Sequence, residues 1–123
     1  MNKGRKASGG RYKKQRKKKH HEKKGKVRSV KIGETKKKHI KKRGGGTRGV
    51  LINANLVNLV DKKTKKASKA KIINVIETPS NRFLARQNIL LKGSVIETDK
   101  GKAKITNRPS QEGSVQAVLI EEN

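Results

Sequence analysis

Apolar and polar residues alternate along Ala70-Lys71-Ile72-Ile73-Asn74-Val75-Ile76-Glu77, with one slip at Ile72-Ile73. A period of two places successive side chains on opposite faces of a β-strand. The slip predicts that this strand is central in its sheet or carries a β-bulge. No sustained apolar stripe with the 3.6-residue helical period is visible in the chain, so the sequence predicts an all-β fold.

Short stretches of the same kind lie on both sides of this strand, and residues typical of turns separate them. The turn signals are Gly44-Gly45-Gly46, Asp99-Lys100-Gly101 and the segments 61–66, 78–81 and 108–113. Gly101 is expected to supply a positive φ in a hairpin. Many short strands predict a small antiparallel β-barrel, with a two-sheet sandwich as the alternative. The expected strands are 27–32, 37–43, 48–53, 56–60, 69–77, 82–87, 94–98, 102–107 and 114–120.

The positive charge is concentrated in the N-terminal part of the chain. The 123 residues carry 35 Lys and Arg against 9 Asp and Glu, a net charge of +26. Residues 1–48 hold 22 of these basic residues and only two acidic ones, so +20 of the charge lies there. A segment with so much charge of one sign and so little to bury does not fold alone. We therefore expect a long basic, largely irregular N-terminal extension at 1–26 and a β-barrel body at 27–123.

A polyanion is the expected partner of so basic a chain. Nucleic acid fits better than a membrane, because no apolar run is long enough to span a bilayer and the basic stretches lack interleaved Leu, Phe and Trp. The first ten residues contain no apolar segment typical of a secretory signal, so we expect a cytoplasmic location. The chain has no cysteine, which excludes disulfides and thiolate metal sites.

The expected contacts are mainly with phosphate and ribose, because clustered cations supply affinity without reading sequence. Tyr12 and Phe83 are the only aromatic residues, so no multi-ring stacking platform is available. Tyr12 lies among charges and is a candidate for stacking, whereas Phe83 lies in an apolar stretch and is expected in the core. Besides Tyr12, the candidate RNA-binding residues of the extension are Lys13, Lys14, Arg16, Lys17, Lys18, Lys19, Lys23 and Lys24.

The glycine run Gly44, Gly45, Gly46 lies between Arg43 and Arg48, which are candidate RNA-binding residues together with it. The run fits two roles. It permits close approach of a phosphate to the backbone, and it is equally an ordinary loop. The motifs of Walker loops and of dinucleotide-binding loops are missing, so no cofactor or small-molecule substrate is expected. His20, His21 and His39 have no cysteine or acidic cluster nearby, so no metal is expected. No nucleophile, base and orienting group can be assembled, so the chain is not expected to be an enzyme.

Several short blocks of the sequence match a known family in the same order. They are Gly4 to Arg11 (Gly-Arg-Lys-Ala-Ser-Gly-Gly-Arg), Lys31 to Lys36 (Lys-Ile-Gly-Glu-Thr-Lys), Arg43 to Gly46, Asn81-Arg82-Phe83 with Arg86-Gln87-Asn88-Ile89, Lys92-Gly93, Ile96-Glu97-Thr98 and Asn107 to Gly113 (Asn-Arg-Pro-Ser-Gln-Glu-Gly). Together they resemble the small-subunit ribosomal protein eight family of archaea and eukaryotes over essentially the whole chain. Ser8 stands where the family pattern has Thr. The chain lacks the long internal insertion of eukaryotic members and is similar to the archaeal type.

The resemblance implies a structural protein of the small ribosomal subunit that binds rRNA, with a β-barrel body and a basic extension threaded into folded rRNA. It implies that Arg5, Lys6, Gly9, Gly10 and Arg11 lie near rRNA, and that Arg43 to Gly46 and Arg108-Pro109 lie in loops facing it. Expected partners are small-subunit rRNA and neighbouring small-subunit ribosomal proteins, with no homo-oligomer. Two alternatives remain: a pre-ribosomal assembly factor, which would be expected to carry an additional domain, and a nucleoid DNA-binding protein, which would be expected to dimerise.

Overall fold

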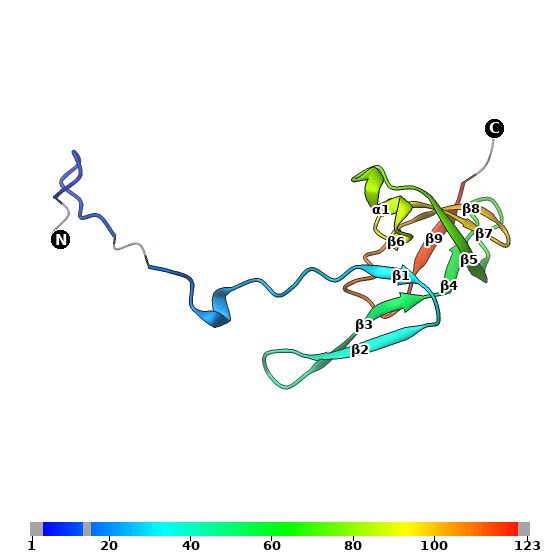
Figure 1. Cartoon of the computed structure of the whole chain (residues 1–123), viewed down its shortest axis with the longest axis horizontal. Coiled ribbons are helices and arrows are strands. Elements are labelled where there is room, and N and C mark those ends of the chain that lie inside the picture. The colour runs from blue at the N-terminus through cyan, green and yellow to red at the C-terminus, as the bar shows by residue number, and fades with distance from the viewer. Residues whose placement is uncertain (1–3, 14–15, 121–123) are drawn as a thin grey trace.

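A computed structural model describes residues 4–13 and 16–120 and divides into an extension and a compact body (Figure 1). Every described residue from 4 to 29 is exposed to solvent. The one helical element there is the short 3-10 helix η1 (His20–Glu22). All nine strands that the structure describes belong to the body.

Five strands of the body close into a barrel. They are β4 (Leu56–Val60), β5 (Ala67–Glu77), β7 (Val95–Thr98), β8 (Gly101–Ile105) and β9 (Gln116–Leu119), and they follow one another around the barrel in that order. The predicted all-β barrel is therefore confirmed. It is not entirely antiparallel, because β9 closes the barrel by pairing with β4 in parallel, through Asn58↔Gln116, Leu59↔Ala117 and Val60↔Val118.

The remaining strands form a second sheet of order β2-β3-β1-β6, which the sequence did not predict as a separate layer. They are β2 (Lys36–Lys41), β3 (Thr47–Ala54), β1 (Val30–Ile32) and β6 (Ile89–Leu90). Strands β2 and β3 form a long antiparallel hairpin, while β1 pairs with β3 in parallel. In Figure 1 the hairpin projects from the body below the extension.

One hydrophobic core joins the two sheets. Val30, Leu51 and Leu90 from the second sheet pack in the same cluster as Leu59 and Ile96 from the barrel, and each is at most 2% exposed. The alternation expected of barrel strands is visible in β4, where Val57 and Leu59 are buried and their neighbours Leu56, Asn58 and Val60 are exposed. Burial of this single core is what orients the hairpin relative to the barrel.

The predicted irregularities of the strands are confirmed. The register of β5 against β7 shifts between Ile72 and Asn74, which makes the slip at Ile73 a bulge in a strand that lies between β4 and β7. Gly101 has a φ of +115° at the turn between β7 and β8. Gly44 and Gly45 each have a φ of +85° at the end of the β2–β3 hairpin.

The expected strand at 82–87 is wrong, because Arg82–Arg86 forms the helix α1. Asn81 is its N-cap and accepts a hydrogen bond from the Phe83 N–H at 3.0 Å. Ala85 packs against the core, whereas Phe83 is 68% exposed. The prediction that Phe83 is a core residue is therefore also wrong, because a single helical turn turns this ring outward while a smaller residue faces inward.

Other expected strands differ at their ends. Strand β1 begins at Val30, and Val27, expected at the start of a strand, is 99% exposed. The last strand is limited to Gln116–Leu119 instead of 114–120. Strand β6 follows α1 directly and was not predicted, because two residues are too few to show a period of two.

Candidate nucleic-acid interface

Residues 5–12 of the extension form a small loop of their own. Arg5 and Arg11 pair as an isolated β-bridge, the Lys6 N–H donates to the Gly10 carbonyl at 2.9 Å, and the Gly9 N–H donates to the Lys6 carbonyl at 2.8 Å. Gly9 makes the turn with a φ of +79°, a conformation that favours glycine. The Arg5 guanidinium also donates to the Gly9 carbonyl at 3.1 Å. The candidate residues Arg5, Lys6, Gly9, Gly10, Arg11 and Tyr12 are thus gathered in one cationic loop.

The Tyr12 ring is half-exposed and lies beneath a cation. The ammonium of Lys6 is 5.8 Å from the ring centroid, within the range of a cation–π contact. With this contact Tyr12 is still 51% exposed. The ring can therefore meet a base or ribose in the way expected from the sequence.

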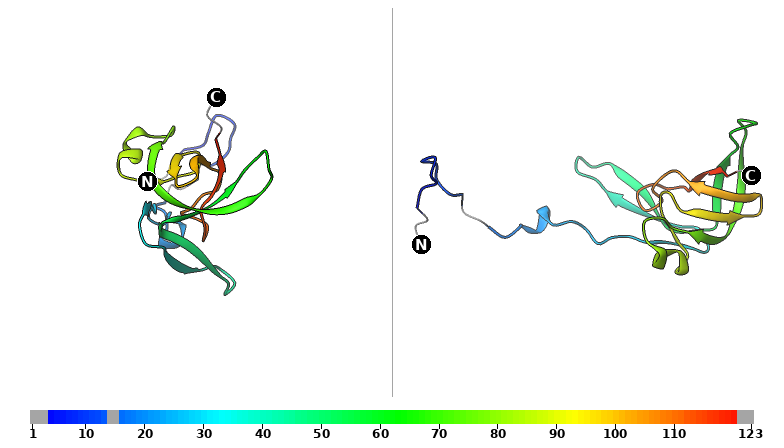
Figure 2. Two further views of the ribbon diagram at one scale, coloured as in Figure 1. Left: turned by 90° about the vertical axis from the view of Figure 1, so that its right-hand side faces the viewer. Right: turned by 90° about the horizontal axis from the view of Figure 1, so that it is seen from above.

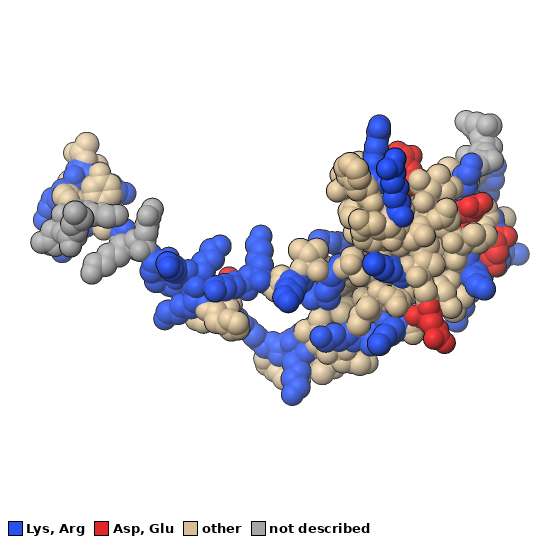
Figure 3. Space-filling view, in the orientation of Figure 1, with Lys and Arg blue, Asp and Glu red and all other residues tan. Residues whose placement is uncertain are grey.

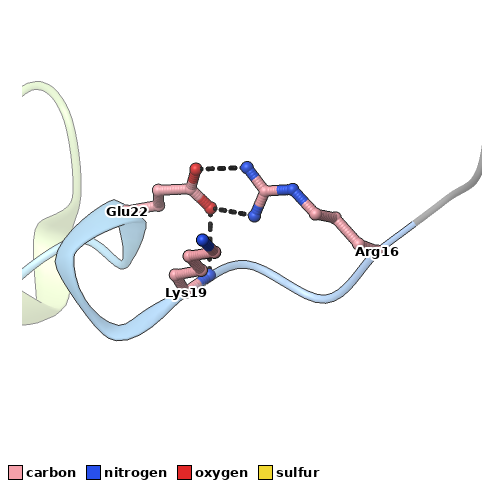
Figure 4. A network of polar contacts seen from close by, with 3 residues as sticks. All are labelled: Arg16, Lys19 and Glu22. Carbon is pink, nitrogen blue, oxygen red and sulfur yellow. Dashed lines mark hydrogen bonds and ion pairs between the residues drawn. The ribbon is translucent and has the colours of Figure 1, made fainter.

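A second local structure surrounds Glu22, the one acidic residue among residues 1–26 (Figure 4). Arg16 donates two hydrogen bonds to its carboxylate, at 2.6 and 2.8 Å, and the Lys19 N–H donates a third at 2.9 Å. The Arg16 guanidinium, and then the Lys19 N–H, lower the pKa of Glu22 below its usual range, and Glu22 in turn raises the pKa of Arg16. Glu22 therefore stays ionised and holds the backbone turn that precedes η1.

The other cations of this stretch have no such partner. The side chains of Lys13, Lys17, Lys18, Lys23 and Lys24 are exposed, and within the described part of the chain none makes a hydrogen bond or an ion pair. Lys19 contributes only its backbone to the contact with Glu22. Lys14 lies outside the described residues.

The β2–β3 hairpin carries a second set of cations. Residues 36–48 contain seven Lys and Arg and no Asp or Glu. All seven side chains are exposed, and over residues 4–13 and 16–120 no ion pair or hydrogen bond occupies any of them. They are Lys36, Lys37, Lys38, Lys41, Lys42, Arg43 and Arg48. Sequence reasoning selected only Arg43 and Arg48, although the runs at 36–38 and 41–43 were the signal that would have found the others.

The triple glycine forms the tip of this hairpin. The Lys42 N–H donates to the Gly46 carbonyl at 2.6 Å and closes the turn. A Cβ atom placed on Gly44, Gly45 or Gly46 would meet no atom within 4 Å. Gly44 and Gly45 are therefore favoured by their backbone conformation and not by crowding, and the peptide groups of the tip are open to an approaching phosphate.

The loop that contains Arg108 lies where the extension meets the hairpin. The Leu51 N–H on β3 donates to the Glu112 carbonyl at 3.1 Å, and the Arg28 side chain donates to the Ser110 carbonyl at 3.2 Å. Asn107 fixes the loop from within, because its Nδ2 donates to Glu112 and to the Ser114 carbonyl, both at 2.7 Å. Pro109 is buried and Arg108 is exposed. The extension and β3 of the hairpin are thus connected by hydrogen bonds to the loop that carries Arg108.

The cations are unevenly distributed over the molecule. In Figure 3 the Lys and Arg side chains run along the extension and the hairpin, while the visible acidic side chains lie mainly over the body. Figure 2 shows that the hairpin and the extension leave the body toward the same end. The extension and the hairpin therefore form two positive arms that leave the body toward the same end.

A metal site and a membrane-spanning helix each have requirements that can be checked against the described residues. They contain no group of three or more His, Asp or Glu side chains that could hold a metal ion. No helix in the described part of the chain is long and apolar enough to cross a membrane. What the site provides is fixed positive charge, one accessible tyrosine ring and accessible backbone amides.

Comparison with known proteins identifies one family whose members match nearly the whole chain. The sequence model of the family described as ribosomal protein S8e matches residues 1–120. Proteins named small ribosomal subunit protein eS8 are 41% identical in Methanococcus aeolicus, over 96% of this chain and 93% of the relative, and 43% identical in Methanocorpusculum labreanum, over 95% and 94%. The relative of that name from Hyperthermus butylicus is 48% identical over 68% of this chain, and the match spans 61% of that protein's length.

Proposed function

Because this chain belongs to the ribosomal protein S8e family, we propose that it is a structural constituent of the small ribosomal subunit that binds rRNA through phosphate contacts and acts there in the cytoplasm. The extension and the β2–β3 hairpin are the two rRNA-binding elements. Neighbouring small-subunit ribosomal proteins are the other partners, and the chain acts as a monomer without catalytic activity or a small-molecule substrate.

The observation that carries this proposal is the set of unpaired cations on the hairpin. Seven basic residues stand on a β-hairpin whose base is fixed in the core by Leu51 and Ala54, and no acidic residue occurs between positions 36 and 48. Like charges so close together repel one another, and a domain gains nothing from that repulsion in the absence of an anion. Phosphates would neutralise these charges and release condensed counterions, which is the main source of affinity for RNA.

The roles of the candidate residues follow from their places. Arg5, Lys6 and Arg11 present cations from one small loop, and Tyr12 beside them offers a ring to a base or ribose. Arg43 and Arg48 flank the glycine turn, whose amides can donate to a phosphate. Arg108 lies on the loop between the two arms and contacts RNA that passes between them. Most of these contacts read shape and charge and not base sequence.

Sedimentation of the tagged protein through a sucrose gradient, followed by assay of mature and precursor rRNA, tests the proposal. A constituent protein should remain with mature small subunits after a wash at moderate salt. Confinement to particles containing precursor rRNA would instead identify an assembly factor. A preference for duplex DNA over small-subunit rRNA in a competition assay would favour the nucleoid alternative.

A further inference from the structure

A cavity on the body lies apart from both positive arms. It has a volume of about 560 Å³ and lies between α1 and β5, where Asn74, Ile76, Glu77, Arg82, Ala85 and Arg86 line it. Figures 1 and 2 place α1 on the opposite side of the body from the β2–β3 hairpin. A volume of this size is typical of sites that take a small ligand or one nucleotide. RNA held by the arms would have to bend around the body to reach it.

Two arginines at this cavity have no partner in the described part of the protein. Arg82 and Arg86 are four residues apart on α1, a spacing that places both side chains on one face of the helix. Both are exposed, and neither makes an ion pair or a hydrogen bond within residues 4–13 and 16–120. Glu77 lines the same cavity without pairing with either of them. Two guanidinium groups so placed are suited to bidentate binding of a phosphate.

The aromatic ring next to these arginines is exposed. Phe83 is 68% exposed and Ile76, which lines the cavity, is 45% exposed. Large apolar side chains are normally stabilised by burial, and the fold leaves these two in water. A flat ring in water, on the same short helix as two unpaired arginines, is a surface on which an unpaired base can stack.

Two side-chain amides complete the cavity. The Oδ1 atoms of Asn74 and Asn88 both accept from the Val75 N–H, at 2.9 and 3.4 Å. Since both carbonyl oxygens face the same backbone amide, the two Nδ2 groups, which have no other bond within the described residues, remain available as donors. These donors can bond to acceptors on the edge of a base that enters the cavity.

We propose that this cavity is a second RNA contact, which takes unpaired nucleotides. Arg82 and Arg86 hold a phosphate, the base of that nucleotide enters the cavity beside Ile76, and an adjacent base stacks on Phe83. The inference rests on the proposed rRNA binding and adds a site that differs in chemistry from the arms. Unpaired RNA fits better than a neighbouring protein, because an apolar protein surface would cover two arginines without supplying anions, at a high desolvation cost.

The test measures binding of the full chain to deproteinised small-subunit rRNA over a series of KCl concentrations. Arg82→Ala with Arg86→Ala should weaken binding about 10-fold at low salt and reduce the slope of log K against log salt by about 1 to 2. The matched control, Lys62→Ala with Lys100→Ala, removes the same charge elsewhere on the body and should change the affinity less than about twofold.

Phe83→Ala should weaken binding about 5- to 100-fold, the range expected for loss of one stacked base, and leave the salt slope unchanged. Phe83→Leu keeps an apolar side chain but not the aromatic face and should lose nearly as much. Because the ring is exposed, both variants should keep the urea midpoint of the wild type. Chemical probing of the bound rRNA should show one or two unpaired bases that the wild type protects and these variants do not.

Three results would overturn the inference. Arginine and phenylalanine variants that bind rRNA like the wild type, with the same protected bases, leave the cavity without an RNA role while the proposed function stands. The same result together with loss of a cross-link to a neighbouring protein in reconstituted subunits would make the cavity a protein-docking face. A wild-type chain that does not bind the rRNA would defeat both this inference and the proposed rRNA binding.

Discussion

The extension and the barrel use almost opposite chemistry within one chain of 123 residues. In the described residues from 4 to 29 every side chain is exposed, and the ordered contacts include a small glycine turn, the cluster around Glu22 and the hydrogen bond from Arg28 to the Ser110 carbonyl. The barrel instead buries Leu59, Ile96 and Ile105 to within 1% of complete burial. The residues that would bind the partner are therefore not the residues that fold the protein.

The β2–β3 hairpin lies between these two extremes. Its base shares the core through Leu51 and Ala54, while five of the six residues of β2 are exposed. Cations on the hairpin are therefore held in place before binding, whereas those of the extension lose conformational freedom when they bind. Equal numbers of charges on the two arms are expected to contribute unequally to affinity.

Removal of the extension should produce the largest effect. Residues 1–26 hold 13 basic residues and one acidic residue, so their deletion removes +12. If about 6 to 8 of these cations contact phosphates, the slope of log K against log salt should flatten by roughly 4 to 7 units. The urea midpoint should stay at the wild-type value, because every buried residue of the described chain lies from Val30 onward. Unchanged affinity and slope would place the main electrostatic contacts on the hairpin.

Truncation of a buried side chain in the barrel should lower the stability of the fold and leave RNA binding unchanged. Ile96 is fully buried in β7, so Ile96→Ala removes apolar contacts and should lower the free energy of unfolding by about 2 to 5 kcal/mol. At temperatures where the variant is folded, its salt slope for RNA binding should equal that of the wild type. Urea denaturation and salt-dependent binding, measured on the same preparation, check both parts. A changed slope would show that the core and the arms are coupled.

Substitutions at the glycine tip test the β2–β3 hairpin, which lies between the extension and the barrel in its chemistry. Gly44 and Gly45 have a φ of +85°, where an alanine is strained, so each Gly→Ala change should cost on the order of 1 kcal/mol of folding stability. Gly46 is the matched control, because it lacks a positive φ and has the same open surroundings. If all three alanine variants lose RNA affinity but keep wild-type stability, the glycines act mainly as a phosphate contact and the strain of the turn is not what requires them.

The smallest effect is expected at Glu22. Glu22→Gln frees Arg16 and should raise RNA affinity less than about threefold, with a salt slope at most about 1 unit steeper. Because the pKa of Glu22 is lowered in this structure, the contact is fully present above the ordinary Glu pKa of about 4.3 and is lost as pH falls through the lowered value. Titration of the Glu22 carboxylate by NMR should give a pKa below the ordinary Glu value. A midpoint at or above the ordinary value would disprove the contact.

Local sequence patterns predicted most of the strands. These patterns failed where the structure depends on residues that are far away in the sequence. Strands β4, β5, β7 and β8 and the bulge at Ile73 were predicted from alternation and turn residues. Helix α1 was missed because Phe83 and Leu84 look like part of a strand, although Asn81 after Pro79 is a helix start signal. The parallel pairings of β1 with β3 and of β4 with β9 leave no local mark in the sequence.

The candidate site was predicted in part. Clustered lysines predicted the cationic extension, because charge needs no tertiary structure to be recognised. The lysines of β2 were assigned to a strand and not to the site, since alternation says nothing about which face of a hairpin a partner will meet. Phe83 could not be placed outside the core from composition alone, because its exposure depends on which residue of α1 faces β5.

The parallel contact between β4 and β9 also sets the order in which the chain can fold. Leu59 and Ala117 are neighbours in space but 58 positions apart in the sequence, so their pairing requires closure of a long loop. Contacts of such high sequence separation slow folding. During synthesis from the N-terminus, the cationic extension and the β2–β3 hairpin leave the translating ribosome while the barrel is still open. The two most cationic elements of the chain are therefore exposed before the domain has acquired its stability.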